Sequence, residues 1–468
     1  MKKKPFYSRK IFRKILKYIA LGICTSLVTM TIILYSQNPD VFERLSNLIP
    51  SSSSMNTKLD KSNPSVNVLK TMIKTMFNNY FSICKNFDEI YTNRRKCINS
   101  YGIKASLLES ISTLYLLGLK EEYNQVLQFL KTSYDVSTLK WVNVHEYWTR
   151  GVGSLIESYL ITNNKLFKNL AIKMADQMLK YQESEYQQCY MFDLQNGNCK
   201  KKAWLNGTSI SNIVAGLPEL LALYEITKDK KYVEAADSIF GKIPIQDIQL
   251  HSSYGEDGSG VGPLDLDGYK VSFLYNIALA LTLRDNSEIT SYLMECVSFF
   301  PSELNTDYYD AFPLLDVVKY FAFADIPVIL PPEESLASKV IDAYIDPEYP
   351  AFSLSGKLSG TTGFNFESAG LRELARTSVT DHESLKRFIK IITEGLTRTK
   401  SQKSHSSIRK SSIGKASLSN YQPSNVFGQW TNIGALAASG NLKYVNMSAF
   451  NERGHIIRLK IPQRVHKE

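Results

Sequence analysis

The sequence predicts an all-α protein, a solenoid or closed α/α toroid made of helical hairpins, and three observations support this. From about Val66 onward, apolar residues recur at helical spacing in one segment after another, with short polar loops between them. The alternation of apolar and polar residues that marks β-strands is nearly absent, so no sheet is expected. Counted in antiparallel pairs, the segments make about seven hairpins of similar size.

The helices follow one another along most of the chain. The segment that begins at Lys104 ends at Gly118, a residue that commonly closes a helix. Lys400–Lys415 is rich in Lys and Ser, and we interpret it as an exposed, solvated loop. The expected helices are Val66–Ile83, Lys104–Leu117, Glu121–Thr132, 144–162, Lys165–Lys180, Ser209–Ile226, Lys230–Phe240, 268–284, 286–299, 304–323, 335–345, 365–377, 382–397 and 426–439.

The N-terminus has the pattern of a membrane anchor. Residues 1–17 hold eight basic residues and no acid, and Tyr18–Tyr35 is uncharged and about as long as one membrane span requires. The basic flank indicates a cytosolic N-terminus, so we expect a single-pass type II protein. Residues 36–64 are polar and Ser-rich and are expected to form a flexible stem. The folded domain is then 65–468.

The overall charge of +10 at pH 7 comes almost entirely from that basic tail. Without those eight residues, the remaining Lys and Arg nearly balance the 45 acidic residues. The high pI therefore gives no support to nucleic-acid binding.

Five cysteines follow the predicted span, an odd number, so at least one is unpaired or pairs with another chain. Cys189 with Cys199, and Cys84 with Cys97, could close short loops in an oxidising lumen; five buried thiols are the alternative. Two glycosylation sequons begin at Asn206 and Asn446 and fit a secretory route. The fifth cysteine is Cys296.

The segment 141–161 contains the first candidate site residue. It starts extended and becomes helical near Val144, and Glu146 stands at the entrance of the helix, four residues before Arg150. A carboxylate at that position could act as an acid catalyst. The alternative, favoured by the segment alone, is a surface ion pair at helical spacing worth a few tenths of a kcal/mol.

Several stretches together resemble one family, glycoside hydrolase family 47, which contains the class I α-1,2-mannosidases and their relatives in endoplasmic-reticulum-associated degradation. The matching stretches occur in the family's order over about residues 70–460, and they imply an (α/α)7 barrel. They are SLLESISTLYLLGL at Ser106–Leu119, NVHEYWTRGVGSLIESYLIT at 143–162, LPELLALYEITKDKKY at Leu217–Tyr232, FNFESAGLRELART at Phe364–Thr377, the run Leu396–Lys400, and KYVNMSAFNERGH at Lys443–His455.

The resemblance implies an inverting hydrolase, which needs one carboxyl group to protonate the leaving oxygen and another to activate water. By position, Glu146 matches the family's general acid, and Asp267 and Glu367 match its candidates for base and essential partner; a shift of two residues would replace Asp267 by Asp265. Arg150 matches an arginine that could bind sugar hydroxyls. Without the resemblance, Asp267 reads as a helix N-cap and Glu367 as a first-turn acid.

The family's calcium shell looks largely lost. The calcium-binding Thr corresponds to Glu452 and the Glu beside it to Arg453, and calcium requires six to eight oxygen ligands. Calcium is thus the family's cofactor, but whether this chain holds it is left open. Other acidic positions of the family fall on residues that carry no carboxylate: Ser112, Asn212, Val271, Gly370 and Ser424 or Asn425.

Two functions follow from these comparisons of motifs. The first is a membrane-anchored, lumenal hydrolase of the endoplasmic reticulum or Golgi that trims α-1,2-linked mannose from high-mannose N-glycans. The second is a degenerate barrel that binds mannose glycans or misfolded glycoproteins without cutting them. A structural α/α scaffold unrelated to sugars fits the ordered motifs poorly.

Overall fold

In the computed structural model the chain divides into two units, Met1–Ser53 and Ser54–Glu468, and all described residues lie in the second. The described residues are 59, 63–92, 94–181, 189–202, 207–247, 249–255, 257–261, 268–298, 320, 362–364, 386, 389–390, 393–394, 397, 408–410, 416–418, 421–422, 427–428 and 431–461.

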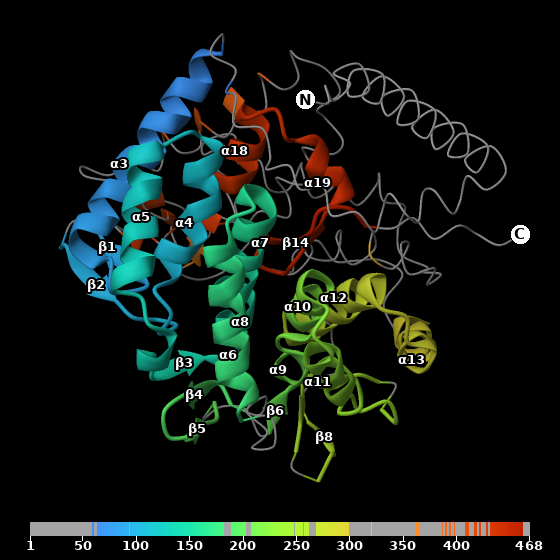
Figure 1. Ribbon diagram of the computed structural model, residues 1–468. Helices are drawn as coiled ribbons and strands as arrows, with labels where there is room; N and C mark the ends of the chain where they lie inside the picture. The colour runs from blue at the N-terminus through green and yellow to red at the C-terminus, as the bar shows by residue number, and fades with distance from the viewer. Residues whose placement is uncertain are drawn as a thin grey trace, which may run out of the picture. The chain divides into compact units, whose positions relative to one another are not determined.

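Five described helices stand next to one another as the inner layer of the domain, and each packs against the next: α18, α4, α7, α10 and α12. Helices α3 and α5 both pack against α4, α8 packs against α7, and α11 packs against α10 (Figure 1). The inner helices are α4 (Ala105–Leu116), α7 (Gly153–Thr162), α10 (Leu217–Thr227), α12 (Gly268–Leu283) and α18 (Thr431–Ala438), and the others are α3 (Pro64–Cys84), α5 (Lys120–Thr132), α8 (Lys165–Leu179), α11 (Lys230–Phe240) and α13 (Ser287–Ser298).

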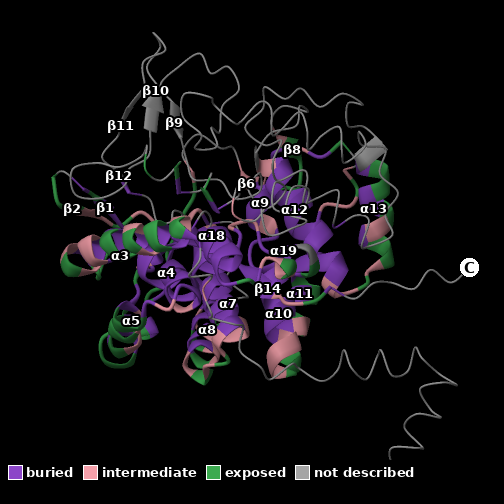
Figure 2. Cartoon of the chain, turned by 90° about the horizontal axis from the view of Figure 1, so that it is seen from above, coloured by how far each residue is buried: buried purple, intermediate pink, exposed green. Residues whose placement is uncertain are grey.

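Burial distinguishes the two layers. Figure 2 shows the inner helices α4, α7, α12 and α18 largely buried, whereas α3, α5, α8 and α13 also carry exposed residues. All residues of α18 are buried, and of α4 only Tyr115 is not. The outer helix α5 buries Glu122, Val126, Phe129 and Leu130. An inner helix is covered all round, so its apolar residues need not keep to one face.

Short polar signals set the helix ends. The side chains of Asn63, Asn164 and Asp229 accept hydrogen bonds from the second backbone N–H of α3, α8 and α11. Each cap satisfies a donor that the helix itself leaves free, and each residue also favours the extended backbone that precedes a helix.

The short helical elements are η1 (Val136–Thr138), α6 (Val144–Glu146), the π-helical turn η2 (Tyr147–Val152), α9 (Ile210–Ile213) and α19 (Lys443–Met447). The expected helix 209–226 is divided into α9 and α10 at Gly216. Gly216 has φ +86°, and a Cβ there would lie 2.4 Å from the Trp148 ring. Only glycine fits both constraints, so the break belongs to the packing between α10 and η2.

The expectation of no sheet is wrong in detail. The described strands pair antiparallel in small sheets of order β12-β1-β2, β3-β4-β5, β6-β7-β8, β11-β10-β9 and β13-β14. Strands of two or three residues are too short to show alternation in the sequence. They are β1 (Glu89–Tyr91), β2 (Lys96–Ile98), β3 (Trp141–Asn143), β4 (Met191–Asp193), β5 (Cys199–Lys200), β6 (Thr208–Ser209), β7 (Ser253–Tyr254), β8 (Gly260–Val261), β9 (Thr362–Phe364), β10 (Ile408–Lys410), β11 (Ala416–Leu418), β12 (Tyr421–Gln422), β13 (Ala449–Phe450) and β14 (Ile456–Arg458).

Several predictions fall on residues that the structure does not describe. They concern the basic tail, the span Tyr18–Tyr35, the sequon residue Asn206 and the helices 304–323, 335–345 and 365–377, apart from Tyr320. Among the described helices, none combines the length and the apolar character that a membrane crossing requires.

Both cysteine pairs that the sequence offered are joined. Cys84–Cys97 links the end of α3 to β2, and Cys189–Cys199 links the residue two before β4 to the first residue of β5, with Cα–Cα distances of 5.4 and 5.3 Å. Cys296 is free and buried. Burial raises the pKa of its thiol to about 12, since the thiolate is poorly solvated inside the protein.

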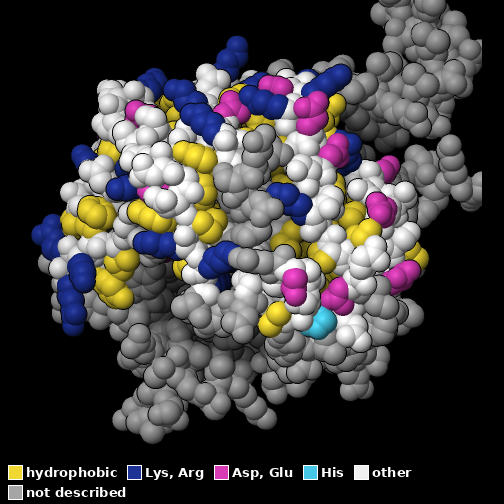
Figure 3. Space-filling model, turned by 90° about the horizontal axis from the view of Figure 1, so that it is seen from below, with side chains coloured by type: hydrophobic (Ala, Val, Ile, Leu, Met, Phe, Trp, Pro, Cys, Tyr) yellow, Lys and Arg dark blue, Asp and Glu magenta, His cyan; other side chains and the backbone are white. Residues whose placement is uncertain are grey.

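The surface carries both signs of charge. On the face shown in Figure 3, Lys and Arg side chains occur together with Asp and Glu side chains, and hydrophobic side chains lie between them. This mixture agrees with the near balance of charge that the sequence indicates beyond residue 17.

The buried carboxylate of Asp88 fixes the loop that leads into α4. Its Oδ2 accepts hydrogen bonds of 2.7 Å from the backbone N–H groups of Tyr101 and Gly102, and its Oδ1 accepts from Ile103 and Ala105 at 3.1 and 2.9 Å. Asp88 therefore orients the helix that contributes Glu109 to the site described below.

Substitution of Asp88 by Ala should lower the free energy of unfolding by about 3 kcal/mol, because several backbone donors lose their acceptor at once. Asp229→Ala, which removes only the exposed cap of α11, should cost about 1 kcal/mol. Urea denaturation of both variants measures the difference, and equal losses would contradict the role given to Asp88.

Cys296 should resist alkylation by iodoacetamide at pH 8 in the native protein, because its thiol is buried and protonated. Mass spectrometry after denaturation without reductant should then find Cys296 alkylated. Cys84, Cys97, Cys189 and Cys199 should react only after reduction; alkylation of any of them without reductant would show that its disulfide is not formed.

Candidate active site

Glu146 lies where a strand turns into a helix. The side chain of Asn143, at the end of β3, accepts a hydrogen bond of 3.0 Å from the Glu146 backbone N–H. Helix α6 ends at Glu146 and continues into η2 and then α7. The Glu146 side chain is 11% exposed, so this carboxylate is nearly buried but still reaches solvent.

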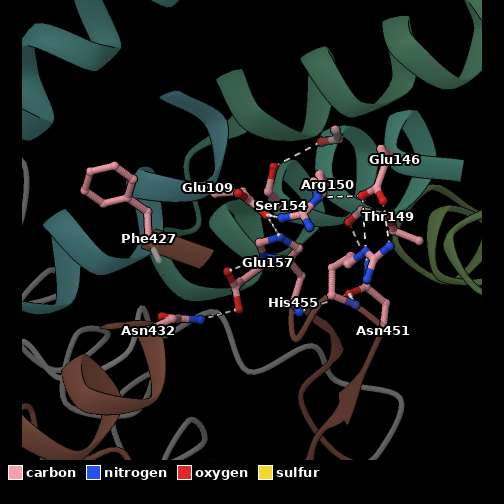
Figure 4. Close-up of polar contacts among 12 residues, drawn as sticks. Glu109, Glu146, Thr149, Arg150, Ser154, Glu157, Phe427, Asn432, Asn451 and His455 are labelled. Atoms are coloured by element: carbon pink, nitrogen blue, oxygen red, sulfur yellow. Dashed lines mark hydrogen bonds and ion pairs between the residues drawn. The ribbon is translucent and has the colours of Figure 1, made fainter. Parts of the chain in front are cut away.

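Arg150, on η2, lies between two carboxylates. Its Nε donates to Glu146 Oε2 at 2.5 Å and its Nη1 donates to Glu109 Oε1 at 2.8 Å (Figure 4). The guanidinium also stacks over the Tyr101 ring, 5.1 Å from its centroid. The pairing of Glu146 with Arg150 expected from their spacing is confirmed, but it is buried and not on the surface.

Arg453 approaches Glu146 from the other end of the chain. Its Nη2 donates to Glu146 Oε1 at 2.6 Å and its Nε donates to Oε2 at 3.1 Å, a two-pronged ion pair. The two arginines together bond both oxygens of the carboxylate. Arg453 is the more accessible of them, with 26% of its side chain exposed against 5% for Arg150.

These contacts determine the charge of Glu146. Burial by itself raises the pKa of the Glu146 carboxyl, but the positive charges of Arg453 and Arg150 outweigh it and leave the pKa well below its usual range. At neutral pH Glu146 is therefore a carboxylate. A general acid needs the opposite, a carboxyl group that holds its proton near the working pH.

A tight turn between β13 and β14 carries Arg453. Asn451 Oδ1 accepts from the backbone N–H groups of Arg453 and His455 at 3.1 and 3.0 Å, and Gly454 within the turn has φ +80°. Asn451 Nδ2 donates to the Thr149 carbonyl at 2.7 Å and to Glu219 Oε1 at 2.8 Å. The turn is thus anchored to η2 and α10.

His455 closes the network on the buried side. Its Nδ1 lies 3.1 Å from Glu157 Oε2 and its Nε2 lies 3.3 Å from Glu109 Oε1. Burial lowers the pKa of His455, but these two carboxylates more than compensate and raise it to about 9. The imidazolium therefore stays charged at neutral pH and donates from both nitrogens. Glu157 also accepts from Asn432 of α18 at 2.7 Å (Figure 4).

Glu452, next to Arg453, is held separately. Its Oε2 lies 3.1 Å from His145 Nε2 and accepts from Ser272 Oγ at 2.7 Å and Asn276 Nδ2 at 3.1 Å. Burial raises the pKa of Glu452, but His145 lowers it further, to about 2. Glu452 is therefore ionised, with its charge balanced by protein groups.

Glu219 is the exception among these acids. It is fully buried on α10, and burial raises the pKa of its carboxyl above the usual range. Glu219 Oε1 accepts a hydrogen bond from the side chain of Asn451, which is uncharged, whereas Glu146 and Glu452 both lie near the positive charge of Arg453.

Comparison with known proteins relates part of this chain to one family. Residues 72–259, which include Glu109, Glu146, Arg150 and Glu219, match the family model described as Glycosyl hydrolase family 47. Over that segment the chain is similar to glycosyl hydrolase family 47. The chain shares its fold with an α-1,2-mannosidase from Trichoderma reesei, with a TM-score of 0.60 and 14% identity over 87% of this chain and 100% of the other. The structure is rich in helices and matches the fold of that enzyme, which supports the expected (α/α)7 fold.

The curated relatives of this chain carry mannosidase names. It is 26% identical over 175 residues to mannosyl-oligosaccharide 1,2-alpha-mannosidase MNS1 of Arabidopsis thaliana, covering 36% of this chain and 30% of that protein. It is 27% identical over 116 residues to mannosyl-oligosaccharide 1,2-alpha-mannosidase IB of Mus musculus, covering 24% and 18%. The matched segments thus span less than a third of these relatives.

The calcium of the family does not fit the described residues. They contain no group of three or more His, Cys, Asp or Glu side chains arranged to hold a metal. Glu452 is engaged by His145, and the adjacent Arg453 adds a positive charge that opposes a cation.

The structure brings Glu146 and Arg150 together, while Asp267, Asp265 and Glu367 lie outside the described residues. Sequence reasoning did not assign Glu109, Glu157 or His455 to the site. The family's terminal motif contained a signal for the last of these, since KYVNMSAFNERGH ends at His455.

Folding stability should fall as the pH rises from about 6.5 to about 9, because His455 binds its proton more tightly in the folded state. The contribution is complete below the unfolded pKa and lost above the folded one, and is on the order of 3 kcal/mol. His455→Gln should flatten this part of the stability profile in urea titrations. A variant that keeps the wild-type slope would show that another group causes it.

Proposed function

We propose that this chain is a family 47 member that acts on high-mannose N-glycans in the endoplasmic reticulum or Golgi, where it removes terminal α-1,2-linked mannose. The support is the match to the family over residues 72–259 and the mannosidase names of its relatives. The fold of the Trichoderma reesei enzyme supports the architecture that such a site requires.

The observation that carries this proposal is the position of Glu146. It lies inside the matched segment, at the start of a helix, and its side chain still reaches solvent. We assign it the role of general acid toward the leaving oxygen of the glycosidic bond, with Arg150 orienting it from η2. Asp267 and Glu367 remain the proposed base and partner of an inverting reaction.

Several features together support a location in a lumen. The two disulfides fit an oxidising compartment. The uncharged stretch Tyr18–Tyr35 after a basic tail fits a type II anchor, so we propose that the domain faces the lumen and the tail faces the cytosol.

A second function is favoured by one specific contact. The ion pair of Arg453 with Glu146 holds the proposed acid as a carboxylate. If this contact persisted during binding, the protein would recognise mannose glycans or misfolded glycoproteins without cleaving them.

The test uses the full-length chain, purified in detergent from a eukaryotic secretory host, and a fluorescent high-mannose glycan. We expect slow release of mannose that falls at least 100-fold in Glu146→Gln, because a general acid contributes about two to four powers of ten to the rate. Chelator should change little, since the described residues do not fit calcium. Glycan binding without mannose release would instead establish the second function.

A further inference from the structure

Of the two arginines on Glu146, only Arg453 is able to leave it easily. Arg150 is 5% exposed and also holds Glu109, so its departure would take a cation away from two buried carboxylates at once. Arg453 is 26% exposed, and among the residues that the structure describes its guanidinium forms an ion pair with Glu146 alone.

The backbone beneath Arg453 is fixed while its side chain is not enclosed. Its N–H is bonded to Asn451, and the Asn451 N–H bonds back to the His455 carbonyl at 2.8 Å. The side chain can therefore rotate toward solvent without moving the turn. Such a change requires rotation about side-chain bonds alone.

The charged and titratable groups that face Glu146 come from every neighbouring element. Arg150 lies on η2, His145 on α6 and Arg453 on the β13–β14 turn, while Tyr101 lies on the loop before α4. Glu109 acts indirectly, through Arg150. Arg453 contributes the largest attraction among these groups, and it is also the most exposed of the cations bonded to the carboxylate.

We propose that Arg453 is an inhibitory latch: its two-pronged ion pair keeps Glu146 from protonating the leaving oxygen, and its withdrawal activates the site. The inference rests on the proposed function, because it assumes that Glu146 is the acid of a glycosidase. In this proposal Arg453 acts on the reaction through its contact with Glu146 and does not need to touch the sugar.

The chemistry shows which substrates the latch affects. In hydrolysis the water oxygen bonds to the anomeric carbon, the glycosidic C–O bond breaks with its electron pair on the leaving oxygen, and the water proton passes to the base. A mannose leaving group must then receive a proton from Glu146. A dinitrophenolate leaves as a stable anion and needs none, so the latch should not slow its release.

The experiment compares two substrates in the full-length protein. Arg453→Met should raise kcat/KM for α-1,2-mannobiose at pH 7 by at least tenfold and leave that for 2,4-dinitrophenyl α-mannoside within threefold of wild type. The fall in activity at high pH should move to higher pH in the variant, because Glu146 then keeps its proton longer. Arg453→Lys retains the positive charge but cannot form the two-pronged ion pair, so its kcat/KM for mannobiose should lie between the values of the wild type and Arg453→Met.

Arg458→Met is the matched control, since Arg458 lies on the adjacent β14 and pairs with Glu225 at 2.7 Å instead. It should leave both rates unchanged. Equal changes on both substrates in Arg453→Met, or no gain with mannobiose, would overturn the latch.

A stability cycle tests the contact independently of catalysis. Unfolding free energies of Arg453→Met, Glu146→Gln and the double variant should be non-additive, and additivity would remove the basis of the proposal. Two other results would count against the proposed function itself. In the first, adding Glu146→Gln to Arg453→Met would leave mannobiose hydrolysis unchanged. In the second, neither the wild type nor Arg453→Met would bind glycan, although the unfolding free energies still showed coupling between Arg453 and Glu146. That second result would refute the mannosidase and leave the ion pair without an inhibitory role.

Discussion

The Arg150 guanidinium, buried between Glu109 and Glu146, is the interaction on which the site depends. Two carboxylates from α4 and α6 could not be buried so close together without a cation between them, since each ion loses several kcal/mol of hydration. Cations and carboxylates continue to alternate on both sides of Arg150. Arg453 bonds to Glu146 on the solvent side, and His455 contacts Glu157 on the buried side. Helices distant in the sequence are thereby held in one register by charge as well as by apolar packing.

The π-helical turn η2 makes this arrangement possible. A wider turn between α6 and α7 changes the direction in which residues after Glu146 point, and the Thr149 carbonyl it presents accepts the Asn451 side chain. Two close approaches depend on the same turn. A Cβ on Gly153 would lie 2.3 Å from Asn451 Nδ2, and Gly216 packs on Trp148. Glycine at both positions lets backbone and side chains meet at van der Waals distance.

Local features of the fold could be predicted from the sequence, and distant pairings could not. Helical spacing predicted α3, α5, α8 and α11 to within a few residues, and the spacing of Glu146 and Arg150 predicted their ion pair. The short strands carry too few residues for a pattern. Nothing in the local sequence links Arg453 to Glu146, which is 307 positions away. The resemblance indicated that both positions matter, but only the geometry shows that they bond to each other.

The turn at 451–455 also has a consequence for the order in which the chain matures. Glu157 meets His455, Asn432 and the Ile456 N–H, all from the last part of the chain, while α7 itself is synthesised much earlier. Until that last part arrives, the Glu157 carboxylate on α7 lacks the partners that make its burial tolerable, so the inner layer cannot close around it. The inner layer therefore reaches its final packing only after residues 432–456 have been synthesised.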